Sequence, residues 1–126
     1  MEVSIIVIGD ELLIGQVQDT NSGWIARHLS PFGWCVKSVK VIGDDASEIF
    51  KAIDDGFAQT DVVLMTGGLG PTKDDITKPA LCKYFGGEMR LDEATRDNVI
   101  KIFEKRHIVM NELTAAQAIV PTSCHV

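Results

Sequence analysis

Residues 66–77, which read TGGLGPTKDDIT, combine glycines, hydroxyls and carboxylates in a way that suits phosphate chemistry. Glycine lets a backbone take positive φ and approach a ligand closely, and successive amides of such a turn can form a concave nest for an anion. The spacing is neither that of a P-loop nor that of the dinucleotide fingerprint. The residues predicted to bind ligand here are Thr66, Gly67, Gly68, Gly70, Thr72 and Lys73. The alternative is a glycine-rich turn that only joins a strand to a helix.

Two adjacent carboxylates, Asp74 and Asp75, follow this turn. Carboxylates beside a phosphate site can hold a hard divalent cation, or one of them can orient a water molecule as a general base. We therefore assign both as catalytic candidates. For Asp74, the alternative is a solvated acid favoured by the dipole of the helix that follows.

A second group of candidate binding residues, Gly9, Asp10 and Glu11, follows the first apolar run. Two acids directly after a buried strand repel each other unless a cation or hydrogen-bond donors meet them. We predict that Asp10 and Glu11 bind a metal ion together with Asp75, or contact a ribose, and that Gly9 and Asn21 also contact the ligand. The alternative is that the two acids are plain turn residues.

A third acidic pair, Asp44–Asp45, precedes a helical pattern. Asp45 is assigned as a catalytic candidate, and a simple helix N-cap is the equally weighted alternative because Glu48 stands at capping-box distance.

The elements that must position these groups alternate along the chain. Strands are expected at residues 3–9, 34–42 and 62–65, and a further strand is expected to begin at 118–120. Helices are expected at 21–30, from Asp45 through Phe57, from Thr77 to the glycines at 86–87, from Asp92 to Arg106, and weakly at 114–118. Residues 10–20 are expected to form a loop. This β-α alternation predicts an α/β fold with a mostly parallel sheet between helices.

The chemical groups fall at the carboxyl ends of the three expected strands, where ligands bind in sheets of this type. Helix faces are expected to bury Trp24, Ile25, His28 and Leu29 in the first helix, Ile49, Ile53 and Phe57 in the second, and Val99, Ile102 and Phe103 in the helix after Asp92. No Ser-His-Asp arrangement or HExxH motif can be assembled.

The composition of the chain indicates which kinds of molecule it can bind. The net charge of −6, with only 12 scattered basic residues among 126, disfavours nonspecific nucleic-acid binding. No segment has the length and apolarity of a signal peptide or of a membrane span. Three widely spaced cysteines without a CxxC pair indicate a reducing, cytoplasmic environment. The expected partner is a small anionic molecule bound by local groups.

Three stretches carry a resemblance to a known family. IGDELLIGQVQDTN at 8–21, VIGDD at 41–45 and TGGLGPTKDDIT at 66–77 resemble the CinA family (competence/damage-inducible protein A), whose N-terminal part is a molybdopterin-binding-like domain of the MoaB/MogA type. Asn111 and residues 117–121 match a later motif more weakly. The likeness covers essentially the whole chain.

The resemblance implies a three-layer α/β/α sandwich that binds a nucleotide or pterin phosphate at the carboxyl edge of the sheet and forms a homodimer or homotrimer. In the molybdenum-cofactor relatives, the glycine motif cradles molybdopterin and two aspartates serve adenylyl transfer with Mg²⁺. By motif position these aspartates fall on Asp75 and on Asp45 or Asp44. Because no GTAPG-like continuation follows, residues 1–126 are expected to be a single domain truncated at its C-terminal end.

The CinA branch implies metal-dependent hydrolysis of ADP-ribose and similar pyrophosphates. We therefore expect a nucleotide pyrophosphohydrolase that uses Mg²⁺, Mn²⁺ or Co²⁺, with potassium as an optional second cation. The alternatives are molybdopterin binding with adenylyl transfer, and a noncatalytic nucleotide-binding module.

Overall fold

The computed structural model describes residues 1–70, 72 and 75–126. The chain divides into two compact units, Met1–Gly68 and Leu69–Val126, and each is described by itself. The expectation of one truncated domain stays a prediction.

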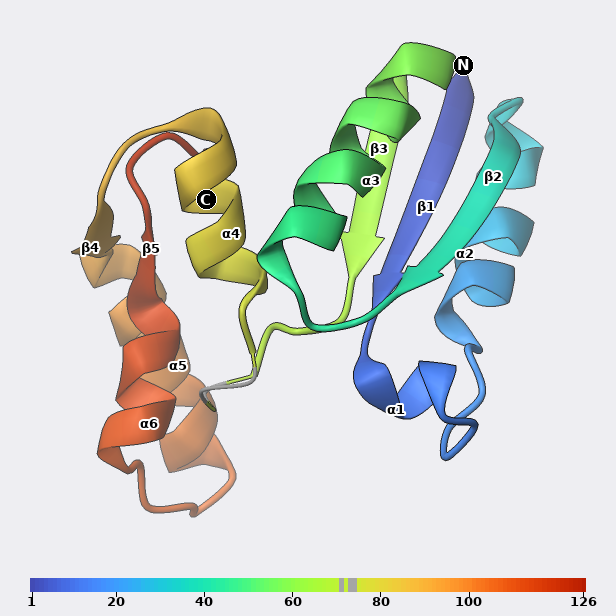
Figure 1. Cartoon of the computed structure of the whole chain (residues 1–126). Coiled ribbons are helices and arrows are strands. Elements are labelled where there is room, and N and C mark those ends of the chain that lie inside the picture. The colour runs from blue at the N-terminus through green and yellow to red at the C-terminus, as the bar shows by residue number, and fades with distance from the viewer. Residues whose placement is uncertain (71, 73–74) are drawn as a thin grey trace. The chain divides into compact units, whose positions relative to one another are not determined.

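The first unit is built on a three-stranded sheet, shown in Figure 1. Its strands are β1 (Glu2–Ile8), β2 (Cys35–Ile42) and β3 (Val62–Thr66), all parallel in the order β2-β1-β3. Val3 to Ile8 are all buried, because the central strand is covered on both faces. The predicted parallel sheet and its three strands are confirmed, with shifts of a residue or two at their ends.

Two helices cover opposite faces of this sheet (Figure 1). α2 (Asn21–Leu29) packs Ile25 and Leu29 against the face that carries Val3, Ile5 and Val7. α3 (Ala46–Gln59) covers the other face and buries Ile49, Ala52, Ile53 and Gly56. The first unit therefore has the expected three layers of helix, sheet and helix.

A β-bulge places Val36 and Val41 of β2 on the same face of the sheet. Val36 lies opposite Val3, but Ser38, two residues later, lies opposite Ser4, so Lys37 is the extra residue. Without the bulge, strict alternation would place Val36 and Val41 on opposite faces of the sheet. With it, both pack against the cluster of Val3, Ile5 and Val7.

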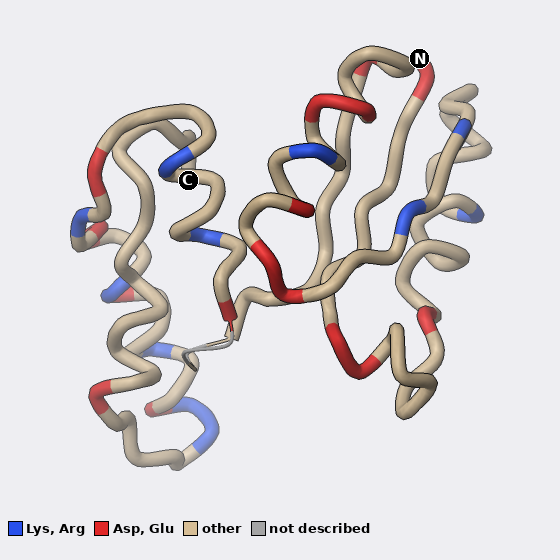
Figure 2. The backbone as a smooth tube through the Cα atoms, in the orientation of Figure 1, with Lys and Arg blue, Asp and Glu red and all other residues tan. Residues whose placement is uncertain are grey.

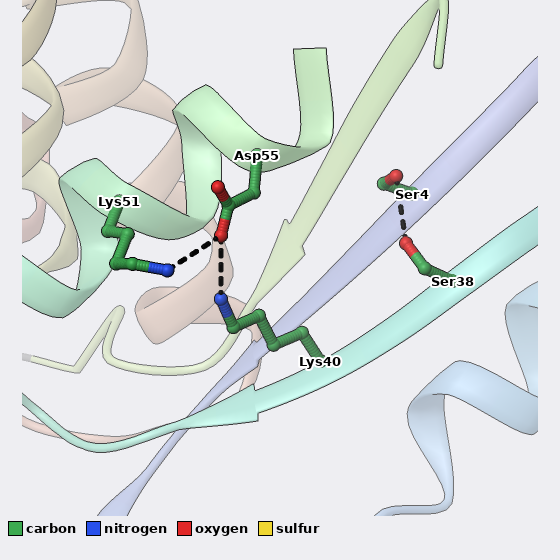
Figure 3. Close-up of polar contacts among 5 residues, drawn as sticks. All are labelled: Ser4, Ser38, Lys40, Lys51 and Asp55. Carbon is green, nitrogen blue, oxygen red and sulfur yellow. Dashed lines mark hydrogen bonds and ion pairs between the residues drawn. The ribbon is translucent and has the colours of Figure 1, made fainter. Parts of the chain in front are cut away.

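The α3 side of the sheet also carries polar groups. The buried Ser4 hydroxyl oxygen accepts a 2.9 Å hydrogen bond from the Ser38 hydroxyl, drawn in Figure 3. It accepts another of 2.9 Å from the Thr60 hydroxyl, and the two offset the cost of burying it. Nearby, the ammonium groups of Lys40 and Lys51 lie 3.1 and 3.2 Å from one Asp55 oxygen. Hydrogen bonds from Lys40 and then Lys51 lower the pKa of Asp55, so its carboxylate is charged at neutral pH.

The expectation of a loop over residues 10–20 is partly wrong, because α1 (Asp10–Leu13) begins directly after β1. Asp10 and Glu11 stand in its first turn, where the helix dipole favours acidic side chains. The helix ends within one turn, and Gly15 follows with φ of 77°. A single turn of helix is too short to show a helical period in the sequence.

Three side chains expected to be buried in α2 and α3 are exposed. Trp24 and Phe57 are 56% and 49% exposed, and His28 is also exposed. In α2 only the Ile25–Leu29 stripe faces the core, because a single sheet face can cover only part of a short helix.

The second unit contains α4 (Thr77–Phe85), β4 (Met89–Leu91), α5 (Glu93–Lys105), α6 (Glu112–Ala115) and β5 (Ile119–Pro121). Short 3₁₀ turns occur at Ser30–Phe32 in the first unit and at Ala116–Ala118 in the second. β4 pairs antiparallel with β5, a strand pair of which only β5 was expected.

Asp92 caps α5 as predicted, accepting a 2.8 Å hydrogen bond from the Thr95 amide. Ile102, expected inside, is 43% exposed. Among the described residues, no helix is long and apolar enough to cross a bilayer.

Gly56 allows α3 to pack closely against β3. A Cβ added at Gly56 would lie 2.8 Å from Val63 Cγ2, closer than side-chain carbons pack. Gly56→Val is therefore expected to lower the free energy of unfolding by about 1–3 kcal/mol through overpacking. Ala58→Val, at an exposed position of the same helix, should change it by less than about 0.7 kcal/mol. Urea unfolding of both variants measures the difference. Because helix propensity alone favours valine over glycine, an unchanged or raised free energy of unfolding in Gly56→Val would contradict the close packing of α3 on β3.

Candidate functional site

The carboxyl ends of β1 and β2 are tied together in the first unit. The Gly9 amide donates to the Ile42 carbonyl at 3.0 Å. One residue further, Asp10 and Asp44 exchange two hydrogen bonds: the Asp44 amide donates to Asp10 Oδ1 at 3.0 Å, and the Asp10 amide donates to Asp44 Oδ2 at 3.1 Å. This reciprocal pair, which we call the Asp10–Asp44 clasp, places two carboxylates side by side at the end of the sheet.

Small residues make room for these carboxylates. A Cβ added at Gly43 would lie 2.6 Å from Asp10 Oδ1, and one added at Gly9 would lie 2.4 Å from Glu11 Oε1. The Gly43 amide also donates to Glu48 Oε2 at 3.1 Å. The glycines that follow β1 and β2 therefore allow acidic side chains to close over the strand ends.

The end of β3 joins the same edge. Gly67 has φ of 97°, and a Cβ there would lie 2.0 Å from the Ile8 carbonyl oxygen, so the turn after β3 packs directly on the end of β1. Asn21, the first residue of α2, donates from Nδ2 to Thr66 Oγ1 at 3.1 Å. Six predicted site residues of the first unit thus gather at one sheet edge: Gly9, Asp10, Glu11, Asn21, Thr66 and Gly67. Gly68 follows directly in the chain.

The charges at this edge are mostly acidic, as Figure 2 shows where β1 leads into α1 and where β2 leads into α3. The basic residues of β2 and α3 that the structure pairs, Lys37, Lys40 and Lys51, bind Glu2 and Asp55 away from the clasp. Because like charges repel, the edge favours a cation, and an anion binds there only when a cation neutralises the carboxylates.

Asp45 lies beside the clasp but works as a helix cap. Its Oδ1 accepts from the Glu48 amide at 3.0 Å and from the Ser47 hydroxyl. The Ser47 hydrogen bond, followed by that of the Glu48 amide, lowers the pKa of Asp45. The observed geometry is that of the capping alternative, with Glu48 turned toward Gly43 rather than toward Asp45.

Replacing the cap separates the two roles of Asp45. Asp45→Ala is expected to lower the melting temperature by a few degrees, because the first turn of α3 loses its side-chain acceptor. The rate of ADP-ribose hydrolysis, the activity expected from the sequence, should stay within about twofold of the parent value, since a surface residue that only caps a helix affects stability and not the reaction. Asp45→Asn, which keeps an acceptor, should restore most of the melting temperature. A large loss of turnover in both variants would return Asp45 to the catalytic set.

In the second unit, Thr72 of the glycine-rich segment forms hydrogen bonds with Asp75, three residues later. Asp75 Oδ2 accepts from the Thr72 hydroxyl at 2.5 Å and from the Thr72 amide at 3.1 Å. A Cβ at Gly70 would lie 2.4 Å from the same oxygen. The hydrogen bond from the Thr72 hydroxyl is the main cause of the lowered pKa of Asp75; desolvation acts in the opposite direction, and the amides of Thr72 and Gly70 add to the lowering. Gly70, Thr72 and Asp75 are thus brought together, whereas Lys73 and Asp74 lie outside the described residues.

The Thr72–Asp75 contact should be pH-dependent. Because the pKa of Asp75 is lowered from its usual 3.8 in the folded state, the contact stabilises this turn above pH 3.8. The stabilisation is lost as the pH falls through the lowered value. The Thr72 amide proton resonance followed by NMR is expected to keep its position from pH 7 to pH 4 and to move only in stronger acid. Movement centred on or above the ordinary value would contradict the contact.

Comparison with known proteins identifies the family. A family profile described as probable molybdopterin binding domain matches residues 4–123. The chain belongs to this family. Within it, the chain is a CinA-like member: the CinA-like protein of Cytophaga hutchinsonii is 42% identical over 122 residues, which cover 97% of this chain and 29% of that protein. A CinA-like protein of Flavobacterium psychrophilum is 42% identical over 129 residues, covering 100% of this chain and 30% of its own length.

Solved structures agree with this assignment. The crystal structure of a CinA protein of unknown function from Thermoplasma acidophilum has a TM-score of 0.81 at 33% identity, covering 98% of this chain and 72% of that one. The tungsten cofactor synthesizing protein MoaB from Pyrococcus furiosus has a TM-score of 0.65 at 24% identity, with 87% and 69% covered, and shows the shared fold alone. This CinA-like chain spans about 30% of the length of the curated relatives named above.

The donor set of this CinA-like edge suits a hard cation. Carboxylate oxygens are the ligands that Mg²⁺ and Mn²⁺ prefer, and Mg²⁺ is commonly held by only one or two carboxylates plus substrate phosphates. Among the described residues, no three Asp, Glu, His or Cys side chains form a ready-made metal cage. Asp10 and Glu11 belong to the first unit and Asp75 to the second, so the three-residue metal set stays a prediction.

Two contributors to the edge were missed from sequence. Asp44 was named only as an alternative to Asp45 for the second aspartate that the resemblance implies, yet it forms half of the clasp, and Glu48 was treated only as a capping residue. The signal for Asp44 was its place directly after the glycine of the second strand, the same place that Asp10 holds after the first. Symmetric positions after neighbouring parallel strands are what meet at a sheet edge.

Proposed function

We propose that this CinA-like chain hydrolyses the phosphoanhydride bond of a nucleotide diphosphate such as ADP-ribose, with a divalent metal ion. The observation that carries the proposal is the convergence of Asp10 and Glu11 with Thr66 and Gly67 at one sheet edge. An edge with paired carboxylates beside close-approaching backbone is suited to a metal–diphosphate ligand, because the cation offsets the repulsion between carboxylates and phosphates.

Each group has a role in this proposal. Asp10 and Glu11 hold Mg²⁺, Mn²⁺ or Co²⁺, and a potassium ion can accompany it. When bound, such a cation screens phosphate charge and polarises the phosphorus centre. The Thr66 hydroxyl and the backbone of Gly67 and Gly68 bind the diphosphate. Asn21, already hydrogen-bonded to Thr66, contacts phosphate or ribose.

The roles expected from sequence for the glycine-rich segment of the second unit stay part of the proposal. Gly70, Thr72 and Lys73 contribute to phosphate binding, and Asp74 and Asp75 orient the attacking water. The water oxygen bonds to one phosphorus, the bridging P–O bond breaks, and AMP and ribose 5-phosphate leave, with the water proton passing to a carboxylate and on to solvent. The lowered pKa of Asp75 keeps this carboxylate ionised and able to accept a hydrogen bond from that water.

The test is a product assay on the purified chain. ADP-ribose is incubated with Mg²⁺, Mn²⁺ or Co²⁺, and in parallel with excess chelator, and AMP and ribose 5-phosphate are quantified by chromatography. The proposal expects equal amounts of both products with at least one metal and none with chelator. The absence of both products under every metal condition would sink it.

A second candidate has its own support. Membership in the molybdopterin-binding family and the fold shared with MoaB favour binding of molybdopterin followed by adenylyl transfer. This candidate predicts tight binding of a pterin phosphate, and formation of an adenylylated pterin from ATP, without release of AMP from ADP-ribose. Nucleotide binding without any turnover would instead indicate a noncatalytic module.

A further inference from the structure

An aromatic pair on α2 is left on the surface. Trp24 and His28 stack with ring centroids 3.7 Å apart and an interplanar angle of 20°. His28 Nδ1 also lies 2.8 Å from the Trp24 carbonyl oxygen, which holds the imidazole in place. Trp24 nevertheless remains 56% exposed. Because His28 braces the indole, Trp24 presents a large apolar ring whose orientation is already set.

This ring lies next to the strand-end site of the same unit. Asn21 and Trp24 are three residues apart on α2, and side chains at this spacing are neighbours on a helix surface, about 5–6 Å apart at Cβ. Asn21 in turn donates its 3.1 Å hydrogen bond to Thr66, the last residue of β3. The polar contact and the exposed indole therefore follow one another along the helix, leading away from the sheet edge.

The core does not account for Trp24. Ile25 and Leu29 make the packing contacts of α2 with the sheet, so burial needs neither aromatic side chain. Exposed indoles braced in one orientation serve well as stacking platforms, since every nucleobase or pterin has a flat π-face and little conformational entropy is lost on contact.

We propose that Trp24, braced by His28, stacks on the flat heteroaromatic ring of the ligand whose phosphates bind at Thr66 and Gly67. The inference deepens the proposed function and rests on it for the phosphate end. It assigns Trp24 as a specificity-determining residue for ligands that carry a purine or pterin ring. Ligands with the same phosphates and no ring gain nothing from it.

Fluorescence tests the contact directly because the chain has only two tryptophans. Trp34→Phe leaves Trp24 as the single indole. Titration with ADP-ribose in the presence of Mg²⁺ is expected to quench its emission in a saturable way, whereas pyrophosphate should bind without quenching. A pterin monophosphate forms a second arm, and the tighter of the two ring-bearing ligands identifies the source of the ring.

Calorimetry on variants that keep Trp34 supplies the second measurement. Trp24→Ala is expected to weaken ADP-ribose binding about 10–100-fold and to leave pyrophosphate binding unchanged, and Trp24→Phe should restore most of the loss. Phe32→Ala is the matched control, because Phe32 is an aromatic residue of the same unit that is 77% exposed. It should bind both ligands as the parent chain does.

The outcomes separate this inference from the proposed function. ADP-ribose hydrolysis with unchanged affinity in Trp24→Ala would overturn the stacking role and leave the hydrolase proposal standing. Ring-dependent quenching without hydrolysis would support stacking and contradict the hydrolase proposal. Equal quenching by pyrophosphate, or no binding of either ring-bearing ligand, would overturn the inference.

Discussion

Asp10→Asn is expected to lower kcat/KM for ADP-ribose about 100-fold to 1,000-fold, the loss typical when a charged group that stabilises the transition state is removed. The substitution is nearly isosteric, and an asparagine Oδ1 can still accept the hydrogen bond that the Asp44 amide now donates to Asp10. The clasp between the strand ends should therefore survive, so the change isolates the negative charge. Initial rates measured at several metal concentrations should show that the variant needs a higher metal concentration to reach half of its maximal rate.

Asp61→Asn is the matched control. Asp61 Oδ2 accepts a 2.9 Å hydrogen bond from the Glu2 amide, where β1 begins, at the opposite end of the sheet from the clasp. This variant also keeps an acceptor and loses one charge, and its kcat/KM should match that of the parent chain. Parent-like activity of both variants would remove Asp10 from the metal site. An equal loss of activity in both variants would show that net charge, and not the position of Asp10, matters.

Gly67→Ala is expected to lower the free energy of unfolding by about 2–5 kcal/mol and to abolish ligand binding. Gly67 combines two demands, a φ of 97° that side chains with a Cβ rarely adopt and a Cβ position 2.0 Å from the Ile8 carbonyl oxygen. That overlap involves the backbone of the central strand, which cannot rotate away. Relief requires the turn after β3 to leave the sheet edge, and Thr66 would then lose its place beside Asn21.

Gly15→Ala separates the two demands on Gly67. Gly15 has φ of 77°, and nothing lies within 4 Å of a Cβ added there. Its replacement should cost about 1–2 kcal/mol, the cost of a left-handed backbone alone. Chemical denaturation of both variants, with calorimetric titration of ADP-ribose, measures the effects. Similar stability losses at the two glycines would mean that the contact with Ile8 contributes little.

Strongly patterned elements could be predicted from the sequence. The apolar run of β1 predicted a strand buried on both faces, since only a central parallel strand needs nearly every side chain apolar. Asp92 was correctly predicted to cap α5 because a cap is a contact over three residues. The family could also be recognised, since the TGGLGPT and GDELL motifs are short and contiguous.

Other features depended on distant partners. The exposure of Trp24, His28 and Phe57 contradicts the helical pattern because periodicity shows which side chains share a face, and only packing against a particular sheet decides how much of that face is covered. α1 was missed because one turn of helix has no periodicity, and β4 because three exposed residues do not form a strand signal.

By itself, the sequence determined the parallel α/β arrangement, the family and the residue types available at each strand end, because these follow from local patterns of apolarity, glycine and charge. Only the tertiary structure decided that Asp44 would pair with Asp10, 34 positions away, and that the packing of α2 on the sheet would leave Trp24 exposed. The physical reason is that hydrogen bonds and steric clearances act over a few ångströms. Residues far apart in the chain reach that range only after the strands have aligned in register.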